Sequence, residues 1–347
     1  NYVRGRTVLI TGAGGSIGSE LCRQLFALGP KRLVLLGHGE NSIYEISQEL
    51  SAKAAGTGLP GDFLAPVIGD IRERAKVDAV FREYQPEIVF HAAAHKHVPL
   101  MEFHPDEAVK NNVLGTLNVA RAAEAAGTKK FILISSDKAV RPTNVMGATK
   151  RVAEMIIFCM ARTSNTQFVA VRFGNVLGSR GSVVPLFKKQ IAAGGPVTLT
   201  HPDIVRYFMT IPEAVNLVIQ AGSMDEQRRL YLLDMGQPVR IVDLARNLIS
   251  LSGFEPDRDI EIRFTGLRPG EKLREELLTS GEGVRATGLG KIFTTEPEDV
   301  DCNRFWTEVD ALLDLATEMD AEGIRAKLRE LVPDYGPEVV AACPSTP

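Results

Sequence analysis

The sequence predicts an α/β fold, a doubly wound parallel sheet with a smaller lobe toward the C-terminus. Short, wholly apolar runs alternate with amphipathic helical patterns through the first half of the 347 residues. A glycine-rich turn links the first apolar run to the first helical pattern, and glycines and prolines break the rhythm after about Val176. Strands that are apolar throughout are buried on both faces, which requires helices on each side of a parallel sheet.

Strands and helices are expected to alternate. The strands are expected at Thr7–Thr11, Arg32–Leu36, Leu64–Ile68, Glu87–His91, Lys130–Ser135 and Phe168–Phe173. Apolar residues at helical spacing predict helices at Ile17–Leu28, Ile43–Ala54, Arg74–Tyr84, Asn112–Ala126 and Thr149–Arg162, and later at Ile211–Ala221, Ile241–Ser252 and Val309–Glu330. Residues 1–175 should form the main domain, with 207–250 packing back on it. Residues 176–206 and 251–347 should form the smaller lobe and the C-terminal helices.

Composition excludes several classes of protein. The chain is 44% hydrophobic and 24% charged, and a formal net charge of −3 gives no electrostatic case for nucleic acid. No apolar run reaches the roughly 20 residues that span a bilayer, so this chain is expected in the cytoplasm without membrane contact. Asn1 lies close to the first strand, which suggests a cut from a longer chain. An anchor before Asn1 would hold the protein at the cytoplasmic face of the inner membrane. The cysteines lack paired spacing and are expected to be reduced thiols: Cys22, Cys159, Cys302 and Cys343.

The first strand leads through Gly12-Ala13-Gly14-Gly15-Ser16-Ile17-Gly18 into a helix. Gly12, Gly15 and Gly18 permit a tight turn, close approach of the backbone to a pyrophosphate, and close helix–strand packing. Ser16 and Ile17 open the helix, whose free N–H groups attract phosphate. This pattern at a strand–helix junction predicts a Rossmann-type dinucleotide site. Its spacing resembles that of the short-chain dehydrogenase/reductase superfamily.

The same resemblance extends to other segments beside the expected dinucleotide. Asp70-Ile71 is similar to the superfamily's adenine-contacting pair, although Asp70 would equally serve as a helix N-cap. Ala92-Ala93-Ala94 is similar to a small-residue segment that lies against the cofactor. The second strand ends without the aspartate that often holds the ribose of NAD. Glu40 would replace it on NAD, whereas His38, Asn41 and Ser42 would surround the 2′-phosphate of NADP, so both cofactors stay open.

A second polar group follows the fifth strand. Ser136-Asp137-Lys138 lie at its carboxyl end, where open parallel sheets bind ligands. Met146 and Lys150 are spaced i, i+4 on a helix and should face the same crevice. In the superfamily this pair is Tyr and Lys, and a Met thioether has no proton to exchange. The chain is then either a catalytically silent nucleotide-binding regulator or an enzyme whose proton chemistry has moved. Asp137 and Lys138 favour the second, because they are suited to acid–base work.

The segment from Ser135 to Arg151 closely resembles bacterial UDP-N-acetylglucosamine 4,6-dehydratases, in the Met-bearing, configuration-retaining branch of the extended short-chain dehydrogenases that serves polysaccharide biosynthesis. Residues 91–102, 172–179 and 266–272 resemble the same family. The resemblance implies a tightly bound NAD or NADP and a UDP-N-acetylglucosamine that is oxidised at C4, loses water across C5 and C6, and regains hydride at C6. A nucleotide-sugar 4-epimerase is the alternative enzyme, although epimerases need no acid–base pair for C5 and C6.

The resemblance also implies roles for the strand-end residues. Lys138 would be the base at C5, Asp137 the acid that protonates the C6 hydroxyl, and Ser136 a hydrogen-bond partner of the C4 oxygen. An ordinary lysine pKa of about 10.4 keeps the ammonium dominant at neutral pH. Burial beside Lys150 and the positive nicotinamide ring is therefore expected to lower the pKa of Lys138. The group that deprotonates the C4 hydroxyl stays open, with Asp137 preferred.

On the substrate side, the resemblance places four residues on the nucleotide and two near the sugar. They are Asn175 on the phosphates, Arg206 and Arg268 as pyrophosphate clamps, Glu271 on the uridine ribose, and Lys96 and His97 near the substrate. Arginine suits a clamp because its rigid fork binds phosphate bidentately.

His91 ends an apolar strand and is expected to be a hydrogen-bonded core residue, so no metal site is expected. Met155, Phe158 and Met160 have core or interface spacing on the helix Thr149–Arg162. In the short-chain dehydrogenases that the sequence resembles, this helix commonly packs in a dimer, so the resemblance implies a homodimer or higher oligomer.

Overall fold

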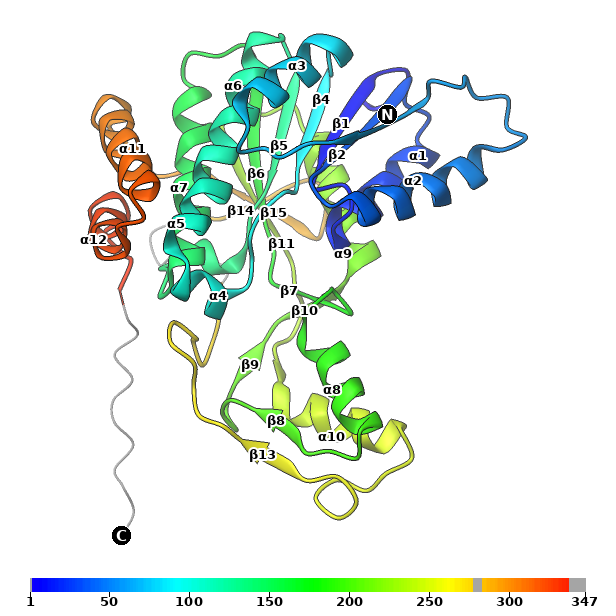
Figure 1. Cartoon of the computed structure of the whole chain (residues 1–347), viewed down its shortest axis with the longest axis vertical. Coiled ribbons are helices and arrows are strands. Elements are labelled where there is room, and N and C mark those ends of the chain that lie inside the picture. Colours follow the sequence, from blue (N-terminus) through cyan, green and yellow to red (C-terminus); the bar gives the residue numbers. More distant parts are fainter. Residues whose placement is uncertain (1, 277–282, 337–347) are drawn as a thin grey trace.

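The computed structural model describes residues 2–276 and 283–336. Its centre is one nine-stranded sheet (Figure 1). In their order across the sheet, the strands are β14 (Arg285–Ala286), β15 (Ile292–Thr295), β11 (Arg229–Leu233), β6 (Gln167–Arg172), β5 (Lys130–Ile134), β4 (Ile88–His91), β1 (Thr7–Thr11), β2 (Arg32–Gly37) and β3 (Leu64–Ile68). Neighbours from β3 to β11 are parallel, whereas β15 is antiparallel to both β11 and β14. The six predicted strands and the parallel doubly wound fold are confirmed.

Alternating strand residues feed two apolar cores, one on each face of the sheet. On β5, Phe131 and Leu133 join one core, and Ile132 and Ile134 join the other. This alternation is why the strands had to be apolar throughout. The first core includes α3 (Arg74–Tyr84), α6 (Gly115–Ala125) and α7 (Val145–Met160), and the second includes α1 (Ser16–Ala27), α2 (Glu40–Ala54) and α9 (Ile211–Gly222) (Figure 1).

The predicted helix Asn112–Ala126 differs from what the structure shows. A short helix α4 (Val98–Phe103), a single turn α5 (Pro105–Ala108) and a π-helical stretch (Val109–Leu114) come before α6. Asn112 lies in the π-helical stretch and anchors the loop after β4. Its Nδ2 donates to the His95 carbonyl at 3.0 Å, and its Oδ1 accepts from the His95 N–H at 2.8 Å. π-Helical turns are often found at functional sites, and this one fixes the loop that carries Lys96 and His97.

The smaller lobe has its own apolar core. It contains α8 (Val183–Ala192), β8 (Val197–Leu199), α10 (Ile241–Leu251) and β13 (Ile262–Phe264), with β8 parallel to β13. Two ribbons link the lobe to the main sheet: β7 (Asn175–Leu177) with β10 (Phe208–Thr210), and β9 (Val205–Arg206) with β12 (Val239–Arg240). The assignment of residues to the main domain and to the smaller lobe differs from the expected one. The apolar face of α10 packs in the lobe, and β14, β15 and the C-terminal helices return to the main domain.

The C-terminal helices are two where one was expected. α11 (Cys302–Thr317) and α12 (Ala321–Leu331) are separated at Met319, whose φ is +57°, and Asp320 caps α12 by accepting from the Gly323 N–H. Both helices share a core with α7 (Figure 1), where Phe158 and Met160 are buried. The core interpretation of these side chains is confirmed, so their spacing gives no argument for a dimer. Within the residues described, no helix has both the length and the apolar character that a membrane crossing requires.

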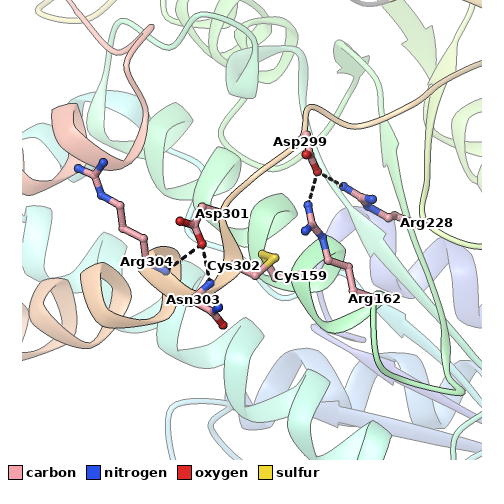
Figure 2. Close-up of a disulfide and its surroundings, with 8 residues drawn as sticks. All are labelled: Cys159, Arg162, Arg228, Asp299, Asp301, Cys302, Asn303 and Arg304. Carbon is pink, nitrogen blue, oxygen red and sulfur yellow. Dashed lines mark hydrogen bonds and ion pairs between the residues drawn. A yellow bond between two sulfur atoms is a disulfide. The ribbon is translucent and has the colours of Figure 1, made fainter.

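A disulfide overturns the expectation of reduced thiols. Cys159, at the end of α7, is bonded to Cys302, the first residue of α11 (Figure 2). Nearby, Asp299 pairs with Arg162 and Arg228, which helps to hold the segment before α11 against the main domain. The two cysteines are 143 residues apart, so local spacing carried no sign of the pair. Cys22 is a free buried thiol, and Cys343 lies outside the described residues.

Candidate active site

The glycine-rich turn between β1 and α1 is packed too tightly for side chains. A Cβ at Gly12, whose φ is +65°, would lie 2.8 Å from the Ala93 backbone, and one at Gly18 would lie 2.1 Å from the Gly12 carbonyl oxygen. A Cβ at Gly14 would meet Ser42 at 2.2 Å. The backbone of Ala92 and Ala93 therefore lies against Gly12. Gly15 is the N-cap of α1 and has no side chain to cap the helix. Free N–H groups at Ser16 and Ile17 are available to phosphate.

The ends of β2 and β3 lie beside this turn. Glu40 is the first residue of α2, and its neighbours His38 and Asn41 are also exposed. Asp70 accepts from the Arg72 N–H at 2.9 Å and from the Arg72 guanidinium at 2.7 and 2.9 Å. The N-cap of α3 is Glu73, so the N-cap interpretation of Asp70 is wrong. Ile71 is buried against Gly115, where a Cβ would approach it to 2.4 Å.

His91 is a hydrogen-bonded core residue, as predicted. Its Nδ1 lies 2.7 Å from Thr11 Oγ1 and its Nε2 lies 3.0 Å from Thr116 Oγ1. Burial, with a smaller effect of the Lys150 charge, lowers the pKa of His91 to about 3. Among the described residues there is no group of three His, Cys, Asp or Glu side chains placed to hold a metal.

We expect the neutral state of His91 to make the fold sensitive to acid. An unfolded histidine titrates near pH 6.5, so between pH 6.5 and 3 the unfolded chain binds more protons than the folded one, and stability falls as pH falls. In urea titrations, the free energy of unfolding should drop by about 3 kcal/mol more between pH 6.5 and 4 in the wild type than in His91→Gln. Parallel pH curves for the two proteins would show that His91 does not set this dependence.

Ser136, Asp137 and Lys138 form a short turn directly after β5. Ser136 Oγ donates to Asp137 Oδ1 at 2.8 Å and accepts from the Lys138 N–H at 3.2 Å. Lys138 Nζ donates to the same Oδ1 at 3.1 Å. Asp137 is fully buried, while Ser136 and Lys138 are partly exposed. The structure therefore joins the three predicted catalytic side chains through one carboxylate oxygen.

The pKa of Lys138 is shifted in the opposite direction from the one expected. Burial opposes its ammonium, but the carboxylates of Asp137 and Glu275 outweigh burial, and the pKa of Lys138 is raised. Glu275 Oε1 lies 3.4 Å from Lys138 Nζ. The expected lowering of the Lys138 pKa is wrong because the adjacent Asp137 carboxylate, and to a smaller extent Glu275 from a distant part of the sequence, stabilise the ammonium.

Lys150 and Met146 lie on the first turns of α7. Asn144 caps this helix by accepting from the Gly147 N–H at 2.7 Å, and a Cβ at Gly147 would lie 2.1 Å from the Lys138 carbonyl oxygen. Lys150 Nζ donates to the Ile134 carbonyl at 2.6 Å, and burial lowers its pKa to about 8. Met146 is 2% exposed and belongs to the core that contains α7. The helix thus brings a buried lysine to the end of β5 and gives residue 146 an apolar surrounding.

The loop after β7 contacts the glycine-rich turn through Arg180, a contact that the sequence did not predict. The Arg180 N–H donates to Ser16 Oγ at 3.1 Å, and its guanidinium donates to the Gly14 carbonyl at 3.2 Å. Lys96 Nζ donates to Ser179 Oγ at 3.4 Å, and a Cβ at Gly181 would lie 2.5 Å from the His97 ring. Burial, together with the Lys138 charge, lowers the pKa of Lys96. Lys96 and His97 therefore lie between this loop and the turn that carries Lys138.

The segment of residues 270–276, here called the return segment, leaves the lobe and lies against the turn of Ser136, Asp137 and Lys138, the candidate catalytic turn. Its contacts are Thr143 Oγ1 and Asn144 Nδ2 to the Gly270 carbonyl (2.9 and 3.0 Å), Lys272 Nζ to the Val140 carbonyl (3.1 Å), and an ion pair of Arg141 with Glu276. Three of the predicted substrate residues, Arg206, Arg268 and Glu271, lie on or next to this segment. Buried Arg206 donates to the Lys272 carbonyl at 2.7 Å, and Glu271 accepts from Thr200 Oγ1 at 3.1 Å. Arg268 is exposed just before the segment, and Asn175 Nδ2 donates to the Tyr207 carbonyl at 3.3 Å.

Residues 8–297 match the family described as polysaccharide biosynthesis protein. The chain belongs to this family. It is 55% identical over 330 residues to the probable polysaccharide biosynthesis protein EpsC of Bacillus subtilis, which covers 94% of this chain and 53% of that protein. It is 59% identical over 278 residues to the capsular polysaccharide biosynthesis protein CapD of Staphylococcus aureus, with 80% and 46% covered. The chain spans about half the length of these two relatives.

Three other similar proteins match this chain over most of their own length. A UDP-glucose 4-epimerase of Rickettsia bellii is 34% identical over 301 residues, 86% of this chain and 85% of that one. The solved structure of Pen from Bacillus thuringiensis superposes with a TM-score of 0.78 at 34% identity, covering 85% of this chain and 90% of that chain. DesIV, a dTDP-glucose 4,6-dehydratase of Streptomyces venezuelae, shares the fold with a TM-score of 0.70 at 19% identity, covering 89% and 99%.

Proposed function

We propose that the chain catalyses the 4,6-dehydration of UDP-N-acetylglucosamine with configuration retained at C5. The observation that carries the proposal is the Asp137–Lys138 pair, held at 3.1 Å at the carboxyl end of β5 beside buried Lys150. A proton-exchanging pair at this place supplies what Met146 lacks. Membership of a polysaccharide biosynthesis family supports a nucleotide-sugar substrate.

The residues around the glycine-rich turn fit a dinucleotide. The close backbone approaches at Gly12 and Gly18 require glycine and let the turn pass tightly from β1 into α1, whose N-terminal N–H groups would face a pyrophosphate. NAD bound there would accept hydride from C4 of the sugar and give hydride back at C6. Glu40 opens α2 at the end of β2, where its carboxylate favours a ribose hydroxyl over a 2′-phosphate, so we propose NAD rather than NADP. Lys150, fixed by the Ile134 carbonyl, would hold the nicotinamide ribose.

The strand-end residues account for each proton. Ser136 would bond the C4 oxygen and pass the C4 hydroxyl proton to Asp137 Oδ1, which it already contacts at 2.8 Å. Lys138 would take the C5 proton in its neutral form, which its raised pKa makes the minor form at neutral pH. Protonated Asp137 would give its proton to the C6 hydroxyl, which leaves as water. The Lys138 ammonium would then return a proton to C5 on the same face. Asp137 ends as a carboxylate and Lys138 as an amine, as they began.

The test is a product analysis. The protein, supplied with NAD, is incubated with UDP-N-acetylglucosamine and the sugar is followed by NMR. We expect a 4-keto-6-deoxy sugar with a methyl group at C6, and no net conversion of NAD to its reduced form. Unchanged substrate would exclude this sugar, and a galacto product would identify a 4-epimerase. The similarity to the Rickettsia bellii UDP-glucose 4-epimerase makes that outcome the alternative function.

A further inference from the structure

Glu275 is a buried carboxylate next to the catalytic turn that no step above uses. Its side chain is 4% exposed, and Oε1 lies 3.4 Å from Lys138 Nζ and 3.8 Å from Arg206 Nε. Its other oxygen, Oε2, is buried without a hydrogen-bond partner in the described part of the chain. A half-satisfied buried carboxylate costs stability rather than adding to it. Such groups are kept at functional sites, so its effect on Lys138 is the feature to explain.

Four charged side chains from different elements surround Lys138. Asp137 comes from the catalytic turn and Glu275 from the return segment, and both are negative. Arg206, from β9, and Lys96, from the loop after β4, are positive. Asp137 Oδ2, like Glu275 Oε2, is buried with no hydrogen-bond partner among residues 2–276 and 283–336. The Lys138 ammonium therefore lies between two carboxylates, each of which has one oxygen unengaged.

We propose that Glu275 is a positioning residue that holds Lys138 against Asp137 and sets the pH at which its amine loses its proton. The inference rests on the proposed function only for the role of Lys138 as the base at C5. In that role Asp137 becomes neutral once it has taken the C4 proton, and Glu275 is then the negative charge that stays beside the lysine. The Glu275 charge favours the Lys138 ammonium, which must return a proton to C5 on the original face. Through Glu275, the return segment therefore contributes to retention of configuration at C5.

The test measures Lys138 directly, without any sugar. The protein is treated with a limiting amount of acetic anhydride at about pH 8, and acetylation of Lys138 is quantified by mass spectrometry. An opposite charge at this distance raises a lysine pKa by about 1–3 units, so Glu275→Gln should raise Lys138 labelling about tenfold or more. Glu276→Gln is the matched control, because Glu276 pairs with Arg141 instead, and it should label as the wild type does. Equal labelling of Lys138 in Glu275→Gln and wild type would overturn the proposal.

Two further measurements keep the result decisive. If Glu275→Gln does not fold, the wild type alone serves: Lys138 should label less than Lys96 at the same pH, and equal or greater labelling would overturn the proposal. For the folded variant, the rising limb of the kcat–pH profile should move to lower pH by about one unit or more, as a purely structural role would not require. Increased labelling without any dehydration product would reject the proposed function and leave this inference standing. Formation of the dehydration product with unchanged Lys138 labelling would support the proposed function and reject this inference.

Discussion

Replacing Lys138 with alanine is expected to lower kcat for dehydration by about 10²–10⁴-fold, the usual contribution of a general acid–base group. Cofactor affinity should be unchanged, because the glycine-rich turn and Lys150 lie on other elements. The measurement is the rate of 4-keto-6-deoxy product formation, with NAD binding followed by fluorescence.

Lys138→Arg separates a base from a cation at this position. Arginine keeps the positive charge but is not deprotonated in proteins, so this variant should be as inactive as Lys138→Ala. Substantial activity in Lys138→Arg would mean that residue 138 acts by its charge, and the C5 base would then have to be found elsewhere.

Replacing Glu154 with glutamine is expected to reduce the free energy of unfolding by about 3–5 kcal/mol, the usual cost of removing one member of a buried ion pair. Glu154 is fully buried and Arg172 is 1% exposed. The two side chains share two hydrogen bonds of 2.8 Å, and Ser135 Oγ donates to Glu154 at 2.6 Å. The residue joins α7, β5 and β6 beneath the catalytic turn. Urea unfolding at neutral pH measures the loss.

Glu298 provides the matched control for Glu154. Its carboxylate pairs with Arg151 at 2.7 Å, but its side chain is 55% exposed. Glu298→Gln should therefore change the free energy of unfolding by about 1 kcal/mol or less. If the two substitutions destabilise the protein equally, burial does not determine how much each ion pair contributes to the free energy of unfolding.

The elements that sequence predicted well are those set by local pattern. The wholly apolar strands and the glycine spacing at Gly12, Gly15 and Gly18 follow from packing on both faces and from the turn itself. The grouping of Ser136, Asp137 and Lys138 is likewise local, since all three lie in one turn.

The features that sequence missed are contacts between distant segments. Glu275 reaches Lys138 because the return segment crosses from the lobe, and it adds to the effect of Asp137 in raising the pKa of the lysine. Arg180 reaches the glycine-rich turn in the same way, and Cys159 pairs with Cys302 through the packing of α11. The residues next to Glu275, Arg180 and Cys159 in the sequence do not indicate which distant residue each contacts. The carboxylates at positions 271, 275 and 276 follow or overlap the family-like segment 266–272, but the sequence does not show which of them reaches Lys138.

The proton chemistry at C5 is tested most directly by running the reaction in deuterium oxide and locating the deuterium by NMR. If Lys138 removes and returns the C5 proton, the product from UDP-N-acetylglucosamine carries deuterium at C5, in retained configuration. The hydrogen delivered to C6 comes from C4, so substrate deuterated at C4 should transfer its label there. A product with its original hydrogen at C5, or with the configuration at C5 inverted, would contradict the assignment of dehydration to the Asp137–Lys138 pair.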